Sequence, residues 1–215
     1  MSASNQLNDI YQCLFDHYGP QRWWPADEPF EVIVGAILTQ STSWVNVEKA
    51  IVNLKEAGVL TPVSLRQIPT EELAEIIRPS GYYNVKACKL KAFVERLGDY
   101  GDSLEKMFAP DIPQLRSGLL SIYGIGQETA DSIILYAAGK PIFVIDAYTH
   151  RIMDRLRLNV DYGNYAALQS FFIKNLPPDE KLFNEYHALF VRHCKEVCRK
   201  SSPSCDNCCL RNICL

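Results

Sequence analysis

The chain has 215 residues, of which 47% are hydrophobic, and a formal net charge of −3. This length allows one large domain or two small ones with a real core. No apolar run reaches the roughly 20 residues that cross a bilayer, and the N-terminus lacks a basic-then-apolar signal, so we expect a cytoplasmic protein with no membrane partner. Eight cysteines without such a signal argue against a disulfide framework. Three of them, Cys13, Cys88 and Cys194, lie in helical patterns and should be reduced core thiols.

Apolar residues recur at three-and-four spacing along nearly the whole chain, which predicts helices with short connections. The second stretch is apolar on all sides, so it should be central and buried. Only residues 143–145 resemble a strand. We therefore predict an all-α fold of about ten helices. The periodic stretches cover residues 7–18, 30–38, 47–54, 73–77, 87–97, 115–122, 130–137, 146–158, 164–175 and 180–196.

The last eighteen residues contain four cysteines in the pattern C-x6-C-x2-C-x5-C, namely Cys198, Cys205, Cys208 and Cys214. The segment between them is polar and turn-rich, with almost no apolar face, so it needs an external centre around which to fold. Four convergent thiolates suit a metal or an iron–sulfur cluster. A structural zinc ion is the alternative occupant. Cys209, next to one of the four, has no assigned role.

A second motif, Tyr123-Gly124-Ile125-Gly126, separates two helical stretches. Glycines at alternate positions permit positive φ and leave backbone N–H groups uncovered. Where such groups start a helix they can hold a phosphate oxygen, although a plain helix–helix turn explains the same pattern. A lone pair of glycines is therefore weak evidence for a function.

Three motifs together resemble the helix-hairpin-helix (HhH-GPD) DNA glycosylases of the endonuclease III type: the hairpin, the sequence VIDAYTHRI with Asp146, and the four cysteines. The resemblance covers nearly the whole chain in the same order. It implies a two-domain endonuclease III-like fold: a six-helix domain with the hairpin at 29–143, and a helical cluster domain formed from 1–28 and 144–215. It also implies a 4Fe-4S cluster on the four cysteines, and DNA as the partner. The protein would then be associated with the nucleoid if it came from a bacterium. We expect it to be a monomer.

Asp146 ends an apolar run and opens a helix, so the simplest interpretation is a helix N-cap. The resemblance makes it the catalytic aspartate. Breaking an N-glycosidic bond builds positive charge on the sugar, as in glycoside hydrolysis. A fixed carboxylate about 4 Å away contributes on the order of 4 kcal/mol at an effective dielectric near 20.

Glu128 occupies the slot where bifunctional members of the family carry a Schiff-base lysine. A carboxylate cannot form that adduct, so we predict a monofunctional glycosylase without efficient lyase activity. A first-turn acid favoured by the helix dipole is the plainer explanation of Glu128. The resemblance adds Gln127 and Tyr148 to the same substrate pocket.

Several residues match the family's DNA contacts. Gln40 matches the glutamine that fills the gap left by an extruded base, since the bond is shielded while the base stays stacked. Tyr82 falls at the wedging position, and Lys86 would then contact a phosphate. The hairpin contacts would be Gly124, Gly126 and Thr129.

The aromatic residues suggest the substrate. Trp23-Trp24-Pro25 and Trp44 match the family's bacterial 3-methyladenine DNA glycosylase III branch. An alkylated purine is cationic, and each stacked ring would attract it by about 0.5–2 kcal/mol. The tryptophans could instead simply cap the core. The alternatives are therefore a glycosylase for another damaged or mismatched base, and a non-catalytic DNA-binding protein that Asp146 argues against.

Overall fold

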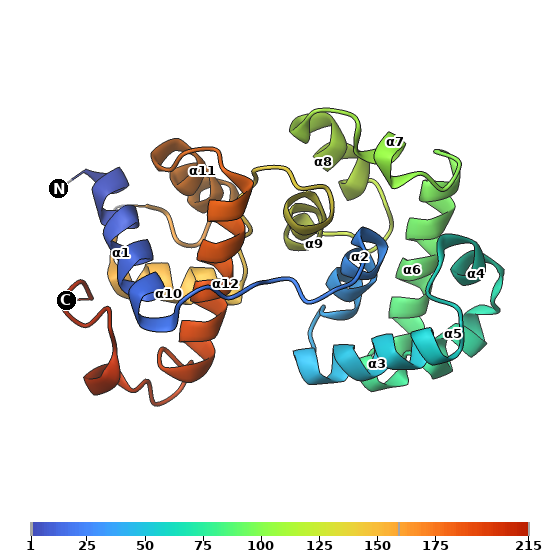
Figure 1. Cartoon of the computed structure of the whole chain (residues 1–215), viewed down its shortest axis with the longest axis horizontal. Coiled ribbons are helices and arrows are strands. Elements are labelled where there is room, and N and C mark those ends of the chain that lie inside the picture. The colour runs from blue at the N-terminus through green and yellow to red at the C-terminus, as the bar shows by residue number, and fades with distance from the viewer. Residues whose placement is uncertain (1, 159, 215) are drawn as a thin grey trace. The chain divides into compact units, whose positions relative to one another are not determined.

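The computed structural model describes residues 2–158 and 160–214. Across these residues the chain is helical and has no strand, so the predicted all-α fold is confirmed (Figure 1). Residues 143–145, which resemble a strand in sequence, form a buried link of irregular backbone. Within the same described ranges, none of the helices combines the length and the apolar character that a membrane span requires.

The chain divides into two compact units. The first contains the described part of residues 1–25 and 141–215, and the second contains residues 26–140. The N-terminal segment thus belongs to the same unit as the C-terminal third. The domain boundaries expected from sequence, at 28/29 and 143/144, fall close to these divisions, but the units as independent domains stay a prediction.

The first unit is built around an aromatic core on α12. Phe143 stacks on Phe172 with ring centroids 3.8 Å apart, and the edge of Tyr186 meets both rings. The Tyr186 hydroxyl donates to the carbonyl of Leu7, 2.8 Å away, which ties α1 to α12. The elements of this unit are α1 (Ala3–Tyr18), α10 (Ala147–Leu156), α11 (Tyr165–Asn175), α12 (Glu180–Glu196) and the short 3-10 turn η3 (Cys205–Asn207).

The second unit surrounds α2, whose residues from Phe30 to Leu38 are all buried. This confirms the central position expected from its apolar sequence. The helix packs against α3, α6, α9 and the π-helical turn η2 that continues α9. The elements are α2 (Pro29–Leu38), α3 (Trp44–Glu56), α4 (Pro62–Gln67), α5 (Thr70–Ile76), η1 (Arg78–Ser80), α6 (Tyr83–Gly98), α7 (Leu104–Phe108), α8 (Ile112–Leu120), α9 (Gln127–Ser132) and η2 (Ile133–Ala137).

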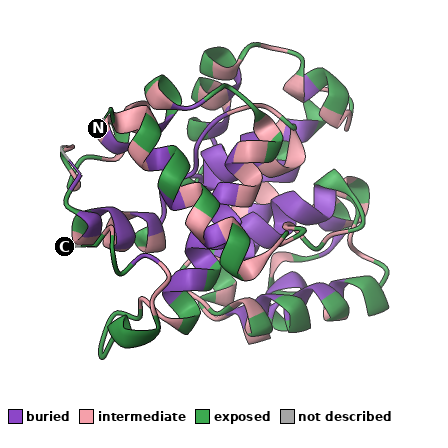
Figure 2. Cartoon of the chain, turned by 60° about the vertical axis from the view of Figure 1, so that its left-hand side comes forward, coloured by how far each residue is buried: buried purple, intermediate pink, exposed green. Residues whose placement is uncertain are grey.

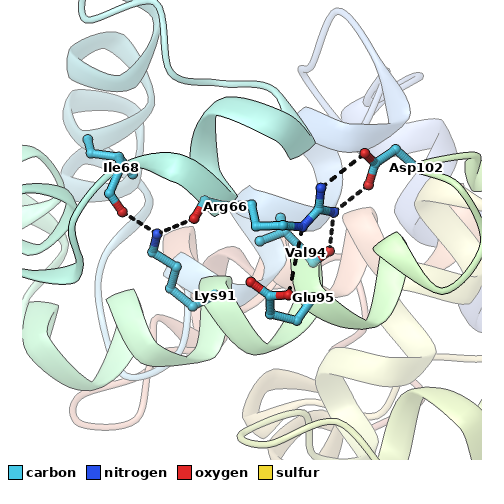
Figure 3. Close-up of polar contacts among 6 residues, drawn as sticks. All are labelled: Arg66, Ile68, Lys91, Val94, Glu95 and Asp102. Atoms are coloured by element: carbon cyan, nitrogen blue, oxygen red, sulfur yellow. Dashed lines mark hydrogen bonds and ion pairs between the residues drawn. The ribbon is translucent and has the colours of Figure 1, made fainter.

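Polar contacts fix α4 and the turn after it on α6. Figure 3 shows the Lys91 ammonium directed at the carbonyls of Arg66 and Ile68, and the Arg66 guanidinium directed at Asp102. The same guanidinium also donates to the Val94 carbonyl. The two bonds from Lys91 satisfy carbonyl groups at the C-terminal end of α4.

Buried positions lie on one side of the outer helices, while exposed positions lie on the other (Figure 2). The cysteines expected in the core follow this pattern only in part. Cys194 is buried as expected, but Cys13 is half-buried and Cys88 is exposed. The prediction of a core position for Cys88 is wrong because Ala87 and Leu90 define the buried face of α6. Cys88 lies beside that face rather than on it.

Candidate functional site

Asp146 is the N-cap of α10 and is buried, with 8% of its surface exposed. Its Oδ1 accepts hydrogen bonds from the backbone N–H of Thr149 at 2.7 Å and from the Thr149 hydroxyl at 2.9 Å. Its Oδ2 lies 3.5 Å from Nε2 of His187 on α12. The N-cap interpretation is therefore correct, but the carboxylate does more than cap, because only one of its two oxygens is used by its own helix.

The surroundings of Asp146 favour the ionised carboxylate. Burial alone raises its pKa, but the nearby imidazole of His187, together with the two bonds from Thr149, outweighs burial and holds the pKa below its usual value. At neutral pH the site therefore contains a desolvated negative charge. Such a charge interacts more strongly with a nearby cation than one in water does.

Tyr148 follows Asp146 in the first turn of α10 and is half-buried. Burial, and after it the charge of Asp146, raise the pKa of the Tyr148 hydroxyl, which therefore stays protonated. The guanidinium of Arg151 lies 5.3 Å from the centre of the Tyr148 ring. The backbone carbonyl of Tyr148 accepts a bond from the thiol of Cys194 at 3.6 Å. One side of α10 thus connects the Asp146 site with the cysteine end of α12.

The glycine motif joins α8 to α9 as a tight hairpin. Gly124 has φ of +79°, and Ile125 between the glycines is buried. Gln40 reaches this turn: its amide nitrogen donates to the Gly124 carbonyl at 3.0 Å and to the Thr129 hydroxyl at 2.9 Å. The structure therefore brings together three of the predicted DNA-contact residues. Gln127 and Glu128 are exposed at the start of α9.

Lys89 supports the same turn, a role that the sequence did not reveal. Its ammonium donates to the side-chain oxygen of Gln40. Its aliphatic stem lies over Gly124, where an added Cβ would stand 2.3 Å from the Lys89 Cγ. Gly124 is thus required by both its backbone angle and the space above it.

The expected phosphate contact of Lys86 does not fit the structure. Lys86 is 1% exposed, and its ammonium donates to the carbonyls of Leu38 at 2.8 Å and Ser80 at 2.7 Å. Burial, with a smaller contribution from the charge of Lys89, lowers its pKa to about 8. The sequence pattern of a basic first turn on α6 cannot distinguish an outward lysine from one that binds helix-end carbonyls inside the unit.

Tyr82 has the properties expected of a wedging residue. Its side chain is 72% exposed, and its backbone adopts the left-handed region at φ of +47°. A non-glycine residue rarely adopts this conformation, and such strain concentrates at functional sites. The wedging role itself stays a prediction.

The tryptophans are divided between the two units. The rings of Trp23 and Trp24 lie 5.3 Å apart at 59° in the first unit, followed by the exposed Pro25. Trp44 opens α3 in the second unit and donates from its indole nitrogen to Glu48 at 2.7 Å. All three indoles are half-buried. Their grouping around one base therefore stays a prediction.

Two of the four cysteines of the terminal loop, Cys198 and Cys208, have partners that suit thiolates. The Arg155 guanidinium donates to Cys198 Sγ at 3.1 Å, and the thiol of Cys214 donates to the Arg155 carbonyl at 3.3 Å. Cys208 Sγ lies 3.4 Å from Nε2 of His193. A hydrogen bond from Cys194 lowers the pKa of Cys198 to about 6, with further contributions from the hydrogen bond and the charge of Arg155.

These contacts fit an iron–sulfur cluster in the kind and number of donors. Burial, and after it the charges of Cys198, Cys214 and Cys205, raise the pKa of Cys208, and two of the four sulfur atoms face a guanidinium or a ring nitrogen. Over residues 2–158 and 160–214, however, no three His, Cys, Asp or Glu side chains converge as ligands of a single metal ion.

Comparison with known proteins identifies the family. The sequence signature of the HhH-GPD superfamily base excision DNA repair proteins matches residues 34–178. A protein of Methanocaldococcus jannaschii with the provisional name of DNA repair glycosylase is 48% identical over 208 residues, covering 96% of this chain and 94% of that protein.

The chain belongs to the HhH-GPD superfamily. Endonuclease III of Thermotoga maritima is 29% identical over 187 residues, covering 87% of this chain and 83% of that protein. The crystal structure of the 3-methyladenine DNA glycosylase of H. pylori bound to 1,N6-ethenoadenine superposes with a TM-score of 0.79 at 28% identity, covering 91% of this chain and 98% of that one. The family and the fold predicted from sequence are therefore confirmed, and this HhH-GPD member is a base excision DNA repair protein of the glycosylase class.

The residues that sequence analysis missed share one property. His187, Lys89, His193 and Arg155 act through partners that are distant in the chain, and each lies in an ordinary helical pattern. A lone histidine among apolar residues, such as His187 between Tyr186 and Ala188, has no sequence signal that separates a core residue from a site residue.

Proposed function

We propose that this HhH-GPD protein is a monofunctional DNA glycosylase that hydrolyses the N-glycosidic bond of alkylated purines. The observation that carries the proposal is the buried carboxylate of Asp146, which accepts two hydrogen bonds from Thr149 and lies 3.5 Å from Nε2 of His187, with its pKa held below the usual value. As the bond breaks, positive charge develops on the deoxyribose. A carboxylate about 4 Å away lowers the barrier by on the order of 4 kcal/mol, or about three decades in rate. Asp146 would also orient the attacking water.

The absence of a lyase step is proposed from Glu128. This residue lies in the first turn of α9 with an exposed carboxylate, at the position where a lyase would need an amine. Incubation with damaged DNA and borohydride tests the point directly. We expect no trapped enzyme–DNA adduct with wild type. If an adduct forms at all, it should form only in Glu128→Lys. An efficient adduct with wild type would contradict the monofunctional assignment.

The substrate class is proposed from the aromatic residues and from the H. pylori enzyme, which is a 3-methyladenine DNA glycosylase. Trp23, Trp24 and Trp44 offer electron-rich faces that favour a cationic purine. The test is single-turnover incubation with methylated duplex DNA, followed by identification of the released base. Release of 3-methyladenine or 7-methylguanine supports the proposal. Release from oxidised or mismatched DNA instead would favour the second candidate, an activity like that of endonuclease III, because this chain is similar to the T. maritima protein of that name.

A non-catalytic DNA-binding role is separated from both by Asp146→Asn. This change keeps the cap geometry and removes the charge. Loss of base release with retained DNA affinity supports catalysis by Asp146. Unchanged release would remove Asp146 from the mechanism.

We also propose that double-stranded DNA with a flipped base is the partner of a monomeric protein. Gln40 would fill the space left by the base, while Tyr82 would stack against the opposite base. The hairpin at Gly124 and Gly126 would approach a phosphate. Substituting the exposed Tyr82 by Ser should weaken binding to a duplex with an abasic analogue more than binding to undamaged DNA.

Finally, we propose that Cys198, Cys205, Cys208 and Cys214 hold a 4Fe-4S cluster. When bound, it would cross-link the terminal segment and shape the basic loop that contains Arg199, Lys200 and Arg211. Iron and sulfide analysis with visible absorption tests this directly, and a colourless protein with one zinc would contradict it. Cys205→Ser should lose the absorption and weaken DNA binding, whereas unchanged affinity without the cluster would refute the architectural role.

A further inference from the structure

Resting on the proposed catalytic role of Asp146, we infer that His187 is a positioning residue of the reaction, which fixes the second carboxylate oxygen so that the charge faces the sugar. The two residues lie 41 positions apart in sequence, on α10 and α12 of the same unit.

The geometry gives each carboxylate oxygen a separate function. Thr149 occupies Oδ1 with two hydrogen bonds from the same helix turn. These bonds leave the second oxygen, Oδ2, without a donor from the same helix turn. His187 Nε2 lies 3.5 Å from Oδ2 and approaches it from the other helix, α12.

His187 is well placed to hold that oxygen. The side chain is buried, 6% of the residue is exposed, and it lies between the buried residues Tyr186 and Ala188. Its ring therefore has little freedom to move. The distance of 3.5 Å exceeds a normal N–H···O bond of about 2.7–3.2 Å. Contacts of this kind are often long in a free enzyme and shorten in the transition-state complex.

The electrostatics agree with this role. His187 is the largest of the influences that lower the pKa of Asp146 against the effect of burial. Tyr148 on α10 and Cys194 on α12 also sense the Asp146 charge, which adds to the larger effects of burial on Tyr148 and of Cys198 on Cys194 in raising their pKa values. Neither is cationic, and Thr149 is neutral. Removing His187 would leave burial less opposed, so the carboxyl would protonate at a higher pH.

The decisive measurement needs no DNA. The carboxyl ¹³C resonance of Asp146, assigned by its loss in Asp146→Asn, is titrated in wild type, His187→Phe and His187→Gln. We expect the midpoint to rise in His187→Phe and to rise less in His187→Gln, since a glutamine amide can occupy the position of Nε2 and donate from it. Equal midpoints in wild type and His187→Phe would overturn the inference. His17→Phe, an exposed histidine of α1 in the same unit, is the matched control and should leave the midpoint unchanged.

The kinetic arm uses the DNA on which wild type is active. Loss of the His187 contact in His187→Phe should slow single-turnover base release by roughly tenfold to a hundredfold at pH 7. The acid limb of the rate profile should shift to higher pH in His187→Phe, while His187→Gln recovers most of the rate. A rate loss without a shifted limb would indicate a merely structural role. A shifted carboxyl titration in a protein whose wild type releases no base would instead retain the pairing and refute the proposed function.

Discussion

The hydroxyl of Tyr18 lies 2.9 Å from Nδ1 of His193, and this contact joins the last turn of α1 to the last turn of α12. The other ring nitrogen of His193 lies 3.4 Å from Cys208 Sγ. A thiolate can only accept, so Nε2 must carry the proton when Cys208 is ionised. Nδ1 of a neutral ring then accepts from the Tyr18 hydroxyl. The N-terminal helix therefore helps to define which ring nitrogen of His193 carries the proton.

Tyr18→Phe removes this hydroxyl and leaves a polar nitrogen of the 1%-exposed His193 without that partner. An unsatisfied buried group costs about 1–3 kcal/mol. We expect the free energy of unfolding in urea to fall by this amount. The control is Tyr123→Phe, whose side chain is 63% exposed and which should unfold as wild type does. Equal stability of both variants would show that the contact contributes nothing.

Lys86→Met removes the ammonium that bridges the last turn of α2 and the turn η1. The carbonyls of Leu38 and Ser80 would then lack a donor. With a cost of about 1–3 kcal/mol for each unsatisfied group, the variant should be strongly destabilised in urea. Lys49→Met, an exposed lysine of α3, provides the comparison and should change stability little. Matching losses in the two variants would contradict an internal role for Lys86.

The lowered pKa of Lys86 predicts a dependence of stability on alkaline pH. The unfolded chain binds the proton up to the ordinary pKa of 10.5, while the folded protein releases it near 8. The unfolded state therefore binds more protons between these values, so stability should rise with pH across this window. A neutral amine keeps two N–H donors, enough for both carbonyls. Unfolding measured from pH 7 to 10.5 should show the rise in wild type and its absence in Lys86→Met; parallel curves would exclude the shift.

The contrast between α2 and Lys86 indicates what sequence can reveal here. An apolar run with no polar face predicts burial without knowledge of partners, and α2 is buried as expected. The glycine hairpin was predictable because glycine has a backbone property of its own. The partners of Lys86 and His187 are set by how distant helices pack, and a single sequence has no local signal for that. The N-cap expected at Asp146 correctly describes its bonds to Thr149 within α10. The contact of Asp146 with His187 on α12 could not be predicted from the sequence.

Gly124→Ala tests the hairpin most sharply, because Gly126 offers a matched control two residues away. Alanine at 124 must adopt φ of +79° and would place its Cβ 2.3 Å from the Lys89 stem. The backbone strain alone costs about 1–3 kcal/mol, and displacing Lys89 would also release its bond to Gln40. At Gly126, φ is −90° and no atom lies within 4 Å of an added Cβ. We therefore expect urea unfolding to detect a clear loss for Gly124→Ala and little change for Gly126→Ala. Similar losses in both would mean that neither the angle nor the Lys89 contact determines the glycine at 124.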